Sequence, residues 1–240
     1  MGKQFVPLEC NPEVFNELMY SLGVSKTLSF HDVFSIDPDM LGMIPRPVLS
    51  VVMAFPVSPQ YEEYRHAQDK DLADDYYNSI SGSADEEAIW IKQTIGNACG
   101  TMALLHTLVN NVPADLIEKD SALDKMIKEL DGLNAIDRTK YLENCAELEQ
   151  FHTTVAGKGS TEAPEASAEV EHHYVCLTKA KKANALYELD GRRKGPIKLG
   201  DLEESDDLLC QKSLEKAKEF LTREGESGQF SIIALGPALD

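Results

Sequence analysis

One cysteine stands where an apolar run of the chain begins. In "IKQTIGNACGTMALLHTL" (91–108), Asn97 is typical of a residue that caps a helix start, so Cys99 is expected in the first turn. The unpaired amides and the positive end of the helix dipole favour a thiolate there, and Gly100 leaves room for a substrate backbone. Cys99 is therefore a candidate nucleophile, the alternative being a small buried core residue.

A thiolate nucleophile normally works with a histidine base that a carboxylate or an amide orients. His106 follows Cys99 by seven residues on the same expected helix. The two are roughly 10 Å apart along the axis, which is too far for direct proton transfer. His172 and His173 open an apolar strand, and because side chains alternate along a strand, only one of them can face the helix side of the sheet. The alternative for this pair is a surface imidazole.

Asp190 and Gln93 supply the remaining chemical groups. Asp190 ends the expected strand "ALYELD", and a strand running back beside the one that starts at His173 brings its carboxylate close to that ring. The Asp-Gly pair is also the usual chemistry of a tight turn. Gln93 precedes Cys99 by six residues. Its amide could stabilise an oxyanion together with the Cys99 backbone N–H, the alternative being a solvated loop side chain.

The 240-residue chain is strongly acidic, with 41 acidic against 23 basic side chains and a formal charge of −18. Such a surface repels phosphate, which disfavours nucleic acids and anionic membranes and favours a basic protein partner. The five cysteines show no CxxC pairing, so we expect neither a disulfide framework nor a zinc site, and a cytoplasmic or also nuclear location. We expect no membrane-spanning segment and no signal peptide.

Capping residues and apolar periodicity outline the elements that must position these groups. Expected helices cover 11–23, 98–109, 114–130, 137–150 and 206–225. Strands are expected in the β-branched run between Pro47 and Pro56, which is typical of burial on both faces, in 172–200 and in 229–235. Strands on both sides of the central helices indicate one shared sheet. The expectation is an α/β fold of α-β-α layers in a single domain over 1–240.

Residues 153–171, "TTVAGKGSTEAPEASAEVE", contain almost no large side chains. A segment of this composition buries too little apolar surface to offset the entropy of ordering it. Long structureless segments inside a compact domain often act as lids or binding loops. The same composition also suits a linker between two domains.

The chain resembles the ubiquitin carboxyl-terminal hydrolase family, specifically its small single-domain members of papain-like type. "QTIGNACGT" looks like the family's nucleophile motif, and several other blocks follow in family order: "PLECNPEVFNELMYSLGV", "DPDMLGMIPRPVLSVVMAFP", "HHYVCL", "LYELDGRRKGPI" and "FSIIAL". The likeness extends over 1–240. It implies a mainly antiparallel central sheet flanked by helices, with a knotted backbone.

The resemblance implies a role for each candidate. Cys99 matches the nucleophile, Gln93 the oxyanion donor, and His173 the general base, which Asp190 orients. His173 matches better than His172 because the family pattern is a histidine, an aromatic and then aliphatic residues, and "HYVCL" begins at His173. The His-to-Asp spacing of 17 (190 − 173) is longer than the family's, which we interpret as an insertion at a hairpin tip.

The resemblance also implies that 153–171 crosses the active site and restricts the size of the ubiquitin adducts that pass. Three acidic residues, Glu9, Glu13 and Asp32, match family positions that bind the basic C-terminal segment of ubiquitin. The alternative for these residues is ordinary solvated acids near helix starts. No metal or cofactor is implied, and we expect a monomer.

The chemistry implied is hydrolysis of small or flexible adducts from the C-terminal glycine of ubiquitin, through a thioester on Cys99. One rival is the same chemistry on a closely related ubiquitin-like modifier. Another is a ubiquitin-binding protein with negligible catalysis, although a pure binder needs none of the four catalytic residue types. A third is a thiol redox protein, but no resolving cysteine lies at short spacing from Cys99.

Overall fold

The structure is a computed structural model and describes residues 2–160, 172–180, 182–223 and 230–239. Within these residues, six strands form one antiparallel sheet in the order β1-β6-β2-β3-β4-β5. The strands are β1 (Leu28–Asp32), β2 (Ser50–Pro56), β3 (His172–Lys179), β4 (Ala185–Leu189), β5 (Ile197–Asp201) and β6 (Ser231–Pro237). Strands that precede and follow 153–171 therefore share one sheet, as expected.

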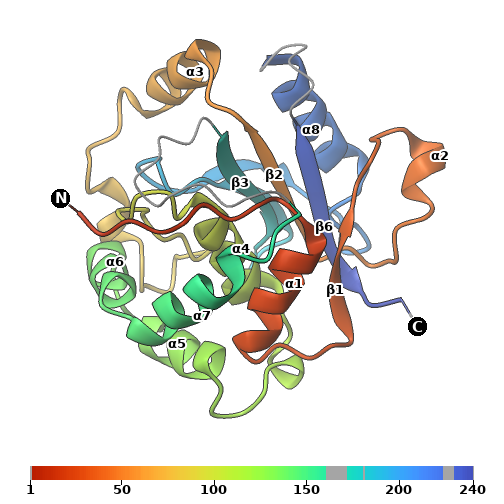
Figure 1. Cartoon of the computed structure of the whole chain (residues 1–240). Coiled ribbons are helices and arrows are strands. Elements are labelled where there is room, and N and C mark those ends of the chain that lie inside the picture. The colour runs from red at the N-terminus through yellow and green to blue at the C-terminus, as the bar shows by residue number, and fades with distance from the viewer. Residues whose placement is uncertain (1, 161–171, 181, 224–229, 240) are drawn as a thin grey trace.

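Helices cover both faces of the sheet (Figure 1). The core on one face includes α1 (Pro12–Ser21), α4 (Cys99–Asn111), α5 (Ala122–Leu130), α6 (Ala135–Glu143) and α7 (Ala146–Ala156). The core on the other includes α2 (Pro38–Leu41), α8 (Gln211–Arg223) and, through Tyr61, α3 (Pro59–Asp69). Two short 3-10 helices, Tyr76–Ser79 and Ala114–Leu116, lie between these elements. The predicted α-β-α layers around a mainly antiparallel sheet are confirmed.

Strand β2 shows how the sheet separates two cores. Val52 and Ala54 pack on the α4 face, whereas Met53 and Phe55 pack on the α8 face. Burial on both faces is what the continuous apolar run predicts. Helix α4, in which all residues but the last are buried, lies against β2 and β3 and places its first residue near one end of the sheet.

The predicted helix over 114–130 is wrong in its first half. Asp120 adopts a left-handed backbone conformation (φ 61°), which a continuous helix cannot contain. Ser121 then caps α5, which begins at Ala122. The break depends on backbone conformation and on a local hydroxyl contact, neither of which apolar periodicity reports.

The predicted helix over 137–150 is two helices. Asn144 is the C-cap of α6, and its side-chain amide donates to the Lys140 carbonyl oxygen at 2.7 Å. Helix α7 starts afresh at Ala146. Asparagine competes in this way for backbone carbonyls and so favours helix ends.

The loop predicted over 153–171 begins later than expected, since its first four residues form the last turn of α7. Residues 161–171 lie outside the described part of the chain. The size restriction that the resemblance implies therefore stays a prediction, as does the knotted backbone.

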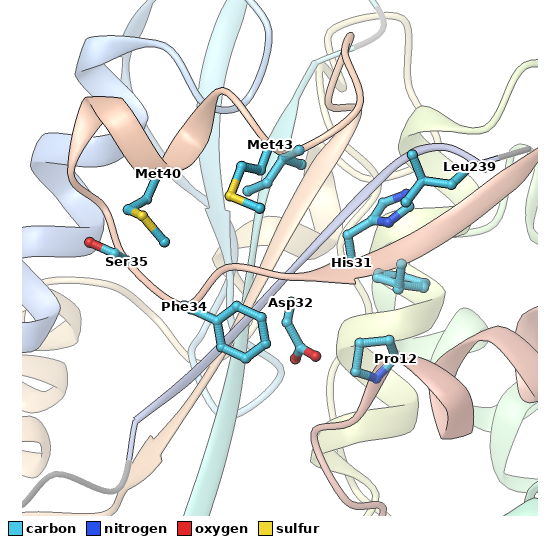
Figure 2. A pocket seen from close by; sticks show the side chains of 10 residues that line it. Pro12, His31, Asp32, Phe34, Ser35, Met40, Met43 and Leu239 are labelled. Atoms are coloured by element: carbon cyan, nitrogen blue, oxygen red, sulfur yellow. The ribbon is translucent and has the colours of Figure 1, made fainter.

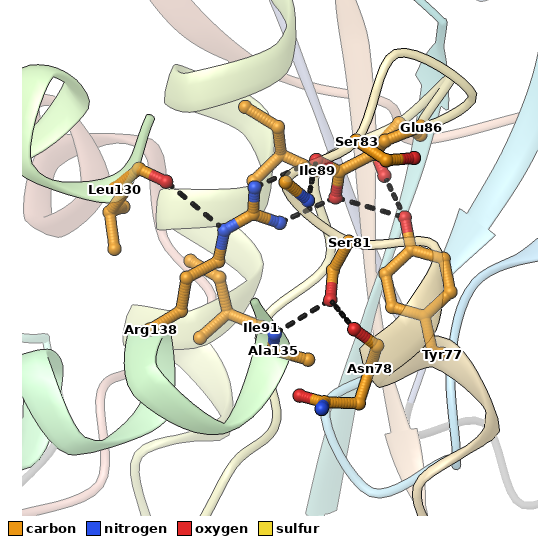
Figure 3. Close-up of polar contacts among 12 residues, drawn as sticks. Tyr77, Asn78, Ser81, Ser83, Glu86, Ile89, Ile91, Leu130, Ala135 and Arg138 are labelled. Atoms are coloured by element: carbon orange, nitrogen blue, oxygen red, sulfur yellow. Dashed lines mark hydrogen bonds and ion pairs between the residues drawn. The ribbon is translucent and has the colours of Figure 1, made fainter. Parts of the chain in front are cut away.

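A buried ion pair anchors the segment that precedes α4 (Figure 3). Both terminal nitrogens of Arg138 donate to the Glu86 carboxylate, at 2.5 and 2.7 Å, and neither side chain is exposed. The Tyr77 hydroxyl and the Gly82 N–H donate to the same carboxylate, and Arg138 Nε donates to the Leu130 carbonyl oxygen. The pair thus ties this segment to α5 and α6.

Replacing Arg138 with methionine leaves the Glu86 charge buried without its partner. We expect Arg138→Met to lower the free energy of unfolding by about 3 kcal/mol, measured by urea denaturation followed by circular dichroism. The double variant Glu86→Gln/Arg138→Met buries no charge and should recover part of the loss. A double variant no more stable than the single one would contradict this account.

Candidate active site

Cys99 is the first residue of α4 and is only 7% exposed. The predicted cap is wrong, because Ala98 is the N-cap and makes no side-chain capping hydrogen bond, while Asn97 adopts a left-handed conformation (φ 57°). The predicted room beside Gly100 is also wrong: an added Cβ would lie 3.1 Å from that of Leu8. Cys99 nevertheless lies in the first turn, where N–H groups lack acceptors within the helix and the dipole is positive.

His172 and His173 begin β3 and point to opposite faces of the sheet. His173 lies opposite Phe55 and shares its face, whereas His172 is on the α4 face and is only half-buried. Cys99 Sγ lies 4.0 Å from the His172 carbonyl oxygen. His173 is on the face away from α4, but Cys99 begins α4 and His173 is the second residue of β3, so the two residues lie at the same end of the sheet. The Cys99 thiol accordingly contributes to the raised pKa of His173.

Asp190 directly follows β4 and is buried. Its Oδ1 accepts hydrogen bonds from His173 Nε2 at 2.7 Å and from the Arg192 N–H at 2.8 Å. Its Oδ2 accepts the Tyr61 hydroxyl at 2.5 Å, and its carbonyl oxygen accepts Trp90 Nε1 at 2.9 Å. Asp190 is therefore both a turn residue and the partner of a histidine.

The two buried groups keep each other charged. Burial alone would lower the pKa of His173, but the Asp190 charge and hydrogen bond, with a smaller contribution from Cys99, raise it to about 9. Burial alone would raise the pKa of Asp190, but its bonds to His173, Tyr61 and Arg192 lower it to about 2. The resulting imidazolium favours the thiolate form of a neighbouring cysteine.

Gln93 lies against the turn that follows Asp190. Its backbone N–H donates to the Gly191 carbonyl oxygen at 2.9 Å, and any Cβ on Gly191 would stand 2.8 Å from that of Gln93. Its Nε2 donates to the Ile95 carbonyl oxygen at 3.2 Å, while Oε1 is buried and has no partner among the described residues. An amide nitrogen carries two N–H donors, so one remains for a substrate oxygen.

The other buried cysteine and two buried histidines have structural surroundings. Cys176 contacts the hydroxyls of Ser50 and Thr107, and burial raises the pKa of its thiol to about 11. Burial lowers the pKa of His106 and of His152 to about 4. Near neutral pH this thiol keeps its proton and these imidazoles stay uncharged. None of the three residues is therefore an activated nucleophile or a charged histidine of the kind found at His173.

The three predicted substrate-binding acids lie around the start of α1 and the end of β1. Glu13 is exposed in the first turn of α1, and Asp32 is the exposed last residue of β1. Burial, followed by the charges of Asp32, Glu9 and Cys99, raises the pKa of the Cys10 thiol. Two of these acids therefore share the surroundings of Cys10 with the candidate nucleophile.

Asp32 also lines an open groove of about 380 Å³ (Figure 2). Large apolar side chains on its walls are strongly exposed, with Phe34 at 87%, Met43 at 75% and Leu239 at 72%. Exposed apolar side chains that gather in this way mark a binding surface. No sequence pattern indicated the groove, because its walls come from the start of α1, from β1 and the segment after it, from α2 and its flanks, and from Leu239.

Tyr61 and Trp90 were also missed, although both donate to Asp190. They lie 129 and 100 residues from it along the chain, and no local spacing connects them. The one available signal was that the chain has a single tryptophan, three residues before Gln93.

Neither a metal site nor a membrane span is found in the part of the chain that the structure describes. No group of three or more histidine, cysteine or acidic side chains there is arranged to hold a metal ion. No helix there is long and apolar enough to cross a bilayer.

A cysteine at a helix start, beside a histidine held by a carboxylate, defines the class of thiol-dependent hydrolases. The family described as "Ubiquitin carboxyl-terminal hydrolase, family 1" matches residues 5–222. Ubiquitin carboxyl-terminal hydrolase 3 of Arabidopsis thaliana is 33% identical over 98% of this chain and 94% of its own. Isozyme L1 of Equus caballus is 32% identical, over 97% and 98%. The chain belongs to this family.

A solved structure shares the fold. The catalytic domain of Trichinella spiralis UCH37, bound to ubiquitin vinyl methyl ester, matches with a TM-score of 0.74 and 20% identity. The match covers 100% of this chain and 97% of that one. The family match and the two relatives confirm the family expected from the sequence motifs, and the chain is a thiol-dependent hydrolase.

The raised pKa of His173 makes stability depend on pH. The pair with Asp190 stabilises the fold fully below the ordinary histidine pKa of 6.5, and this contribution is lost as the pH rises through about 9. We expect the stability advantage of the wild type over Asp190→Asn to shrink between these values. Urea denaturation at about pH 7 and about pH 9 measures the difference. Parallel behaviour of the two proteins would contradict a charged pair.

Proposed function

We propose that this chain hydrolyses adducts from the C-terminal glycine of ubiquitin through a thioester on Cys99. The buried His173–Asp190 pair beside the first residue of α4 is the observation that carries the proposal. Burying such a pair costs desolvation free energy, which a protein that only binds ubiquitin has no need to spend. The acyl-transfer reaction, by contrast, requires a base that is held in place.

In the first half of the reaction His173 holds the proton of the Cys99 thiol as an imidazolium, and the Cys99 thiolate attacks the carbonyl carbon of the terminal glycine. The Cys99 N–H and the second N–H of Gln93 Nε2 stabilise the oxyanion. The imidazolium then returns the proton to the leaving amine or thiol, and the bond to the leaving group breaks. The Asp190 carboxylate keeps the ring of His173 oriented both when it is charged and when it is neutral.

The second half releases ubiquitin. His173 removes a proton from water, the resulting hydroxide attacks the thioester carbonyl, and the Cys99 sulfur leaves. The same two N–H donors serve the second oxyanion. All groups in both halves come from one chain, which supports the expectation that the protein acts as a monomer.

Charge and exposed apolar surface support ubiquitin recognition. Glu9, Glu13 and Asp32 would bind the basic C-terminal segment of ubiquitin, because opposite charges speed encounter and fix orientation. The groove beside Asp32 would accept an apolar side chain from the folded part of the partner. The two surfaces are adjacent, so one bound ubiquitin can occupy both.

The test of the reaction uses ubiquitin that carries a fluorescent amine at its C-terminus. We expect the wild type to release the amine, and Cys99→Ala to lose all turnover while it still binds ubiquitin, measured by fluorescence anisotropy. Cys176→Ala is the matched control, since it removes another buried thiol and should leave turnover within about twofold of the wild-type rate. Retained turnover in Cys99→Ala would exclude Cys99 as the nucleophile.

The same assay separates the rival functions. Tight ubiquitin binding without any turnover by the wild type would leave a binding protein. Faster turnover of the corresponding derivative of a ubiquitin-like modifier would assign the same chemistry to that modifier.

The groove is tested by a charge placed on its wall. We expect Phe34→Asp to raise KM for the ubiquitin substrate about tenfold with little change in kcat. The contact between Phe34 and ubiquitin lies away from the reacting bond, so it contributes the same binding free energy to the ground state and to the transition state. Ile136→Asp is the control, since it charges an exposed apolar position on α6 outside the groove. Equal effects of the two substitutions would show that the groove has no specific role.

A further inference from the structure

Tyr61 contacts both members of the His173–Asp190 pair. It is buried in the first turn of α3, where its N–H donates to the Ser58 hydroxyl that caps the helix. Its ring lies 5.1 Å from that of Phe55 and 5.5 Å from that of His173, between ring centres. Its hydroxyl donates to Asp190 Oδ2 at 2.5 Å.

Helix α3 makes polar contacts with the turn that begins at Asp190. One turn residue, Arg192, pairs with Glu62 at 2.7 Å. The next residue, Arg193, pairs with Asp69 at 2.7 Å, and both of these side chains are buried. One helix therefore holds three of the four residues of the turn 190–193, and Tyr61 makes the contact that reaches the carboxylate itself.

The donors to the Asp190 carboxylate are divided between its two oxygens. Oδ1 accepts from His173 and Arg192, whereas Tyr61 is the donor found on Oδ2 within the described structure. A buried carboxylate oxygen without a donor is costly, so loss of the hydroxyl would let the group rotate toward other partners. Burial and the Asp190 charge raise the pKa of Tyr61, so the hydroxyl keeps its proton and stays a donor.

We propose that Tyr61 is a positioning residue of the hydrolase: its hydroxyl fixes the plane of the Asp190 carboxylate and thereby the orientation of His173 toward Cys99. The inference rests on the proposed function, in which His173 moves the protons. The hydrogen bonds and ring contacts of Tyr61 in the described structure join it to Ser58, Asp190, Phe55, His173 and Arg192, and none of them is to Cys99. The effect of its hydroxyl passes through two hydrogen bonds, from Tyr61 to Asp190 and from His173 to Asp190.

The substitution Tyr61→Phe keeps the ring and removes the hydroxyl. We expect kcat for the fluorescent ubiquitin substrate to fall about tenfold with KM little changed. The alkaline limb of the pH profile of kcat/KM should move to lower pH, because a carboxylate that is held less firmly raises the pKa of His173 less. The downfield proton resonance of the His173–Asp190 hydrogen bond should broaden or disappear in one-dimensional NMR spectra.

A substrate-free readout separates this inference from the proposed function. Iodoacetamide alkylates Cys99 in its thiolate form, which the imidazolium of His173 stabilises. The rate of alkylation of Cys99 near neutral pH should therefore be lower in Tyr61→Phe than in the wild type. Retained turnover in Cys99→Ala would overturn the proposed function. Wild-type kcat, pH profile and resonance in folded Tyr61→Phe would overturn the positioning role alone.

Tyr20→Phe is the matched control. It removes a hydroxyl that donates to the Leu28 carbonyl oxygen at 2.9 Å, away from the site, so it should cost stability without changing kcat or the pH profile. If Tyr61→Phe does not fold, Glu62→Gln tests the same helix by weakening its hold on Arg192. We expect a smaller fall in kcat, about threefold, with the same shift of the alkaline limb. An unchanged profile in Glu62→Gln would then reject the inference.

Discussion

The charged carboxylate of Asp190 is the constraint on which the rest of the site depends. It is buried, and burial alone disfavours its charge, so it must be surrounded by donors. The imidazole of His173, the hydroxyl of Tyr61 and a backbone N–H meet this demand from β3, α3 and the following turn. Each of these elements is thereby fixed relative to the others, and the orientation of the histidine is a consequence.

The site is assembled from both cores of the molecule. Cys99 belongs to the core on the α4 face of the sheet, whereas His173 shares its face with Phe55 of the other core. The two meet only because β3 and α4 both begin at this end of the sheet. The distance between thiol and imidazole therefore depends on how both layers pack on the sheet, and closely packed cores transmit small displacements.

Local signals predicted much of the fold, and long-range contacts account for what they missed. Asn11 caps α1 as expected, since its side chain accepts the Glu13 N–H, and the apolar run of β2 is buried on both faces. Strand pairing predicted that Asp190 lies near His173, but spacing alone could not add Cys99, which lies on a separate helix, and the resemblance to a family supplied that link. Tyr61 was missed because a distant hydroxyl contact has no local sequence signal. Asn97 and Asp120 belong to the residue types that favour the left-handed region, but apolar periodicity and capping patterns do not report that conformation.

Buried ion pairs hold the segments that deliver the site, where apolar packing alone is insufficient. The Glu86–Arg138 pair fixes the segment that leads to Trp90 and Gln93, and Arg193 with Asp69 fixes the turn after Asp190. Apolar contacts are non-directional and tolerate sliding, whereas a buried pair is favourable only in one geometry. A buried ion pair adds little to the free energy of unfolding compared with well-packed apolar residues in the same place. Its contribution here is to fix the positions of the segments that it joins. The irregular segments gain from such pairs the precision that strands and helices obtain from backbone hydrogen bonds.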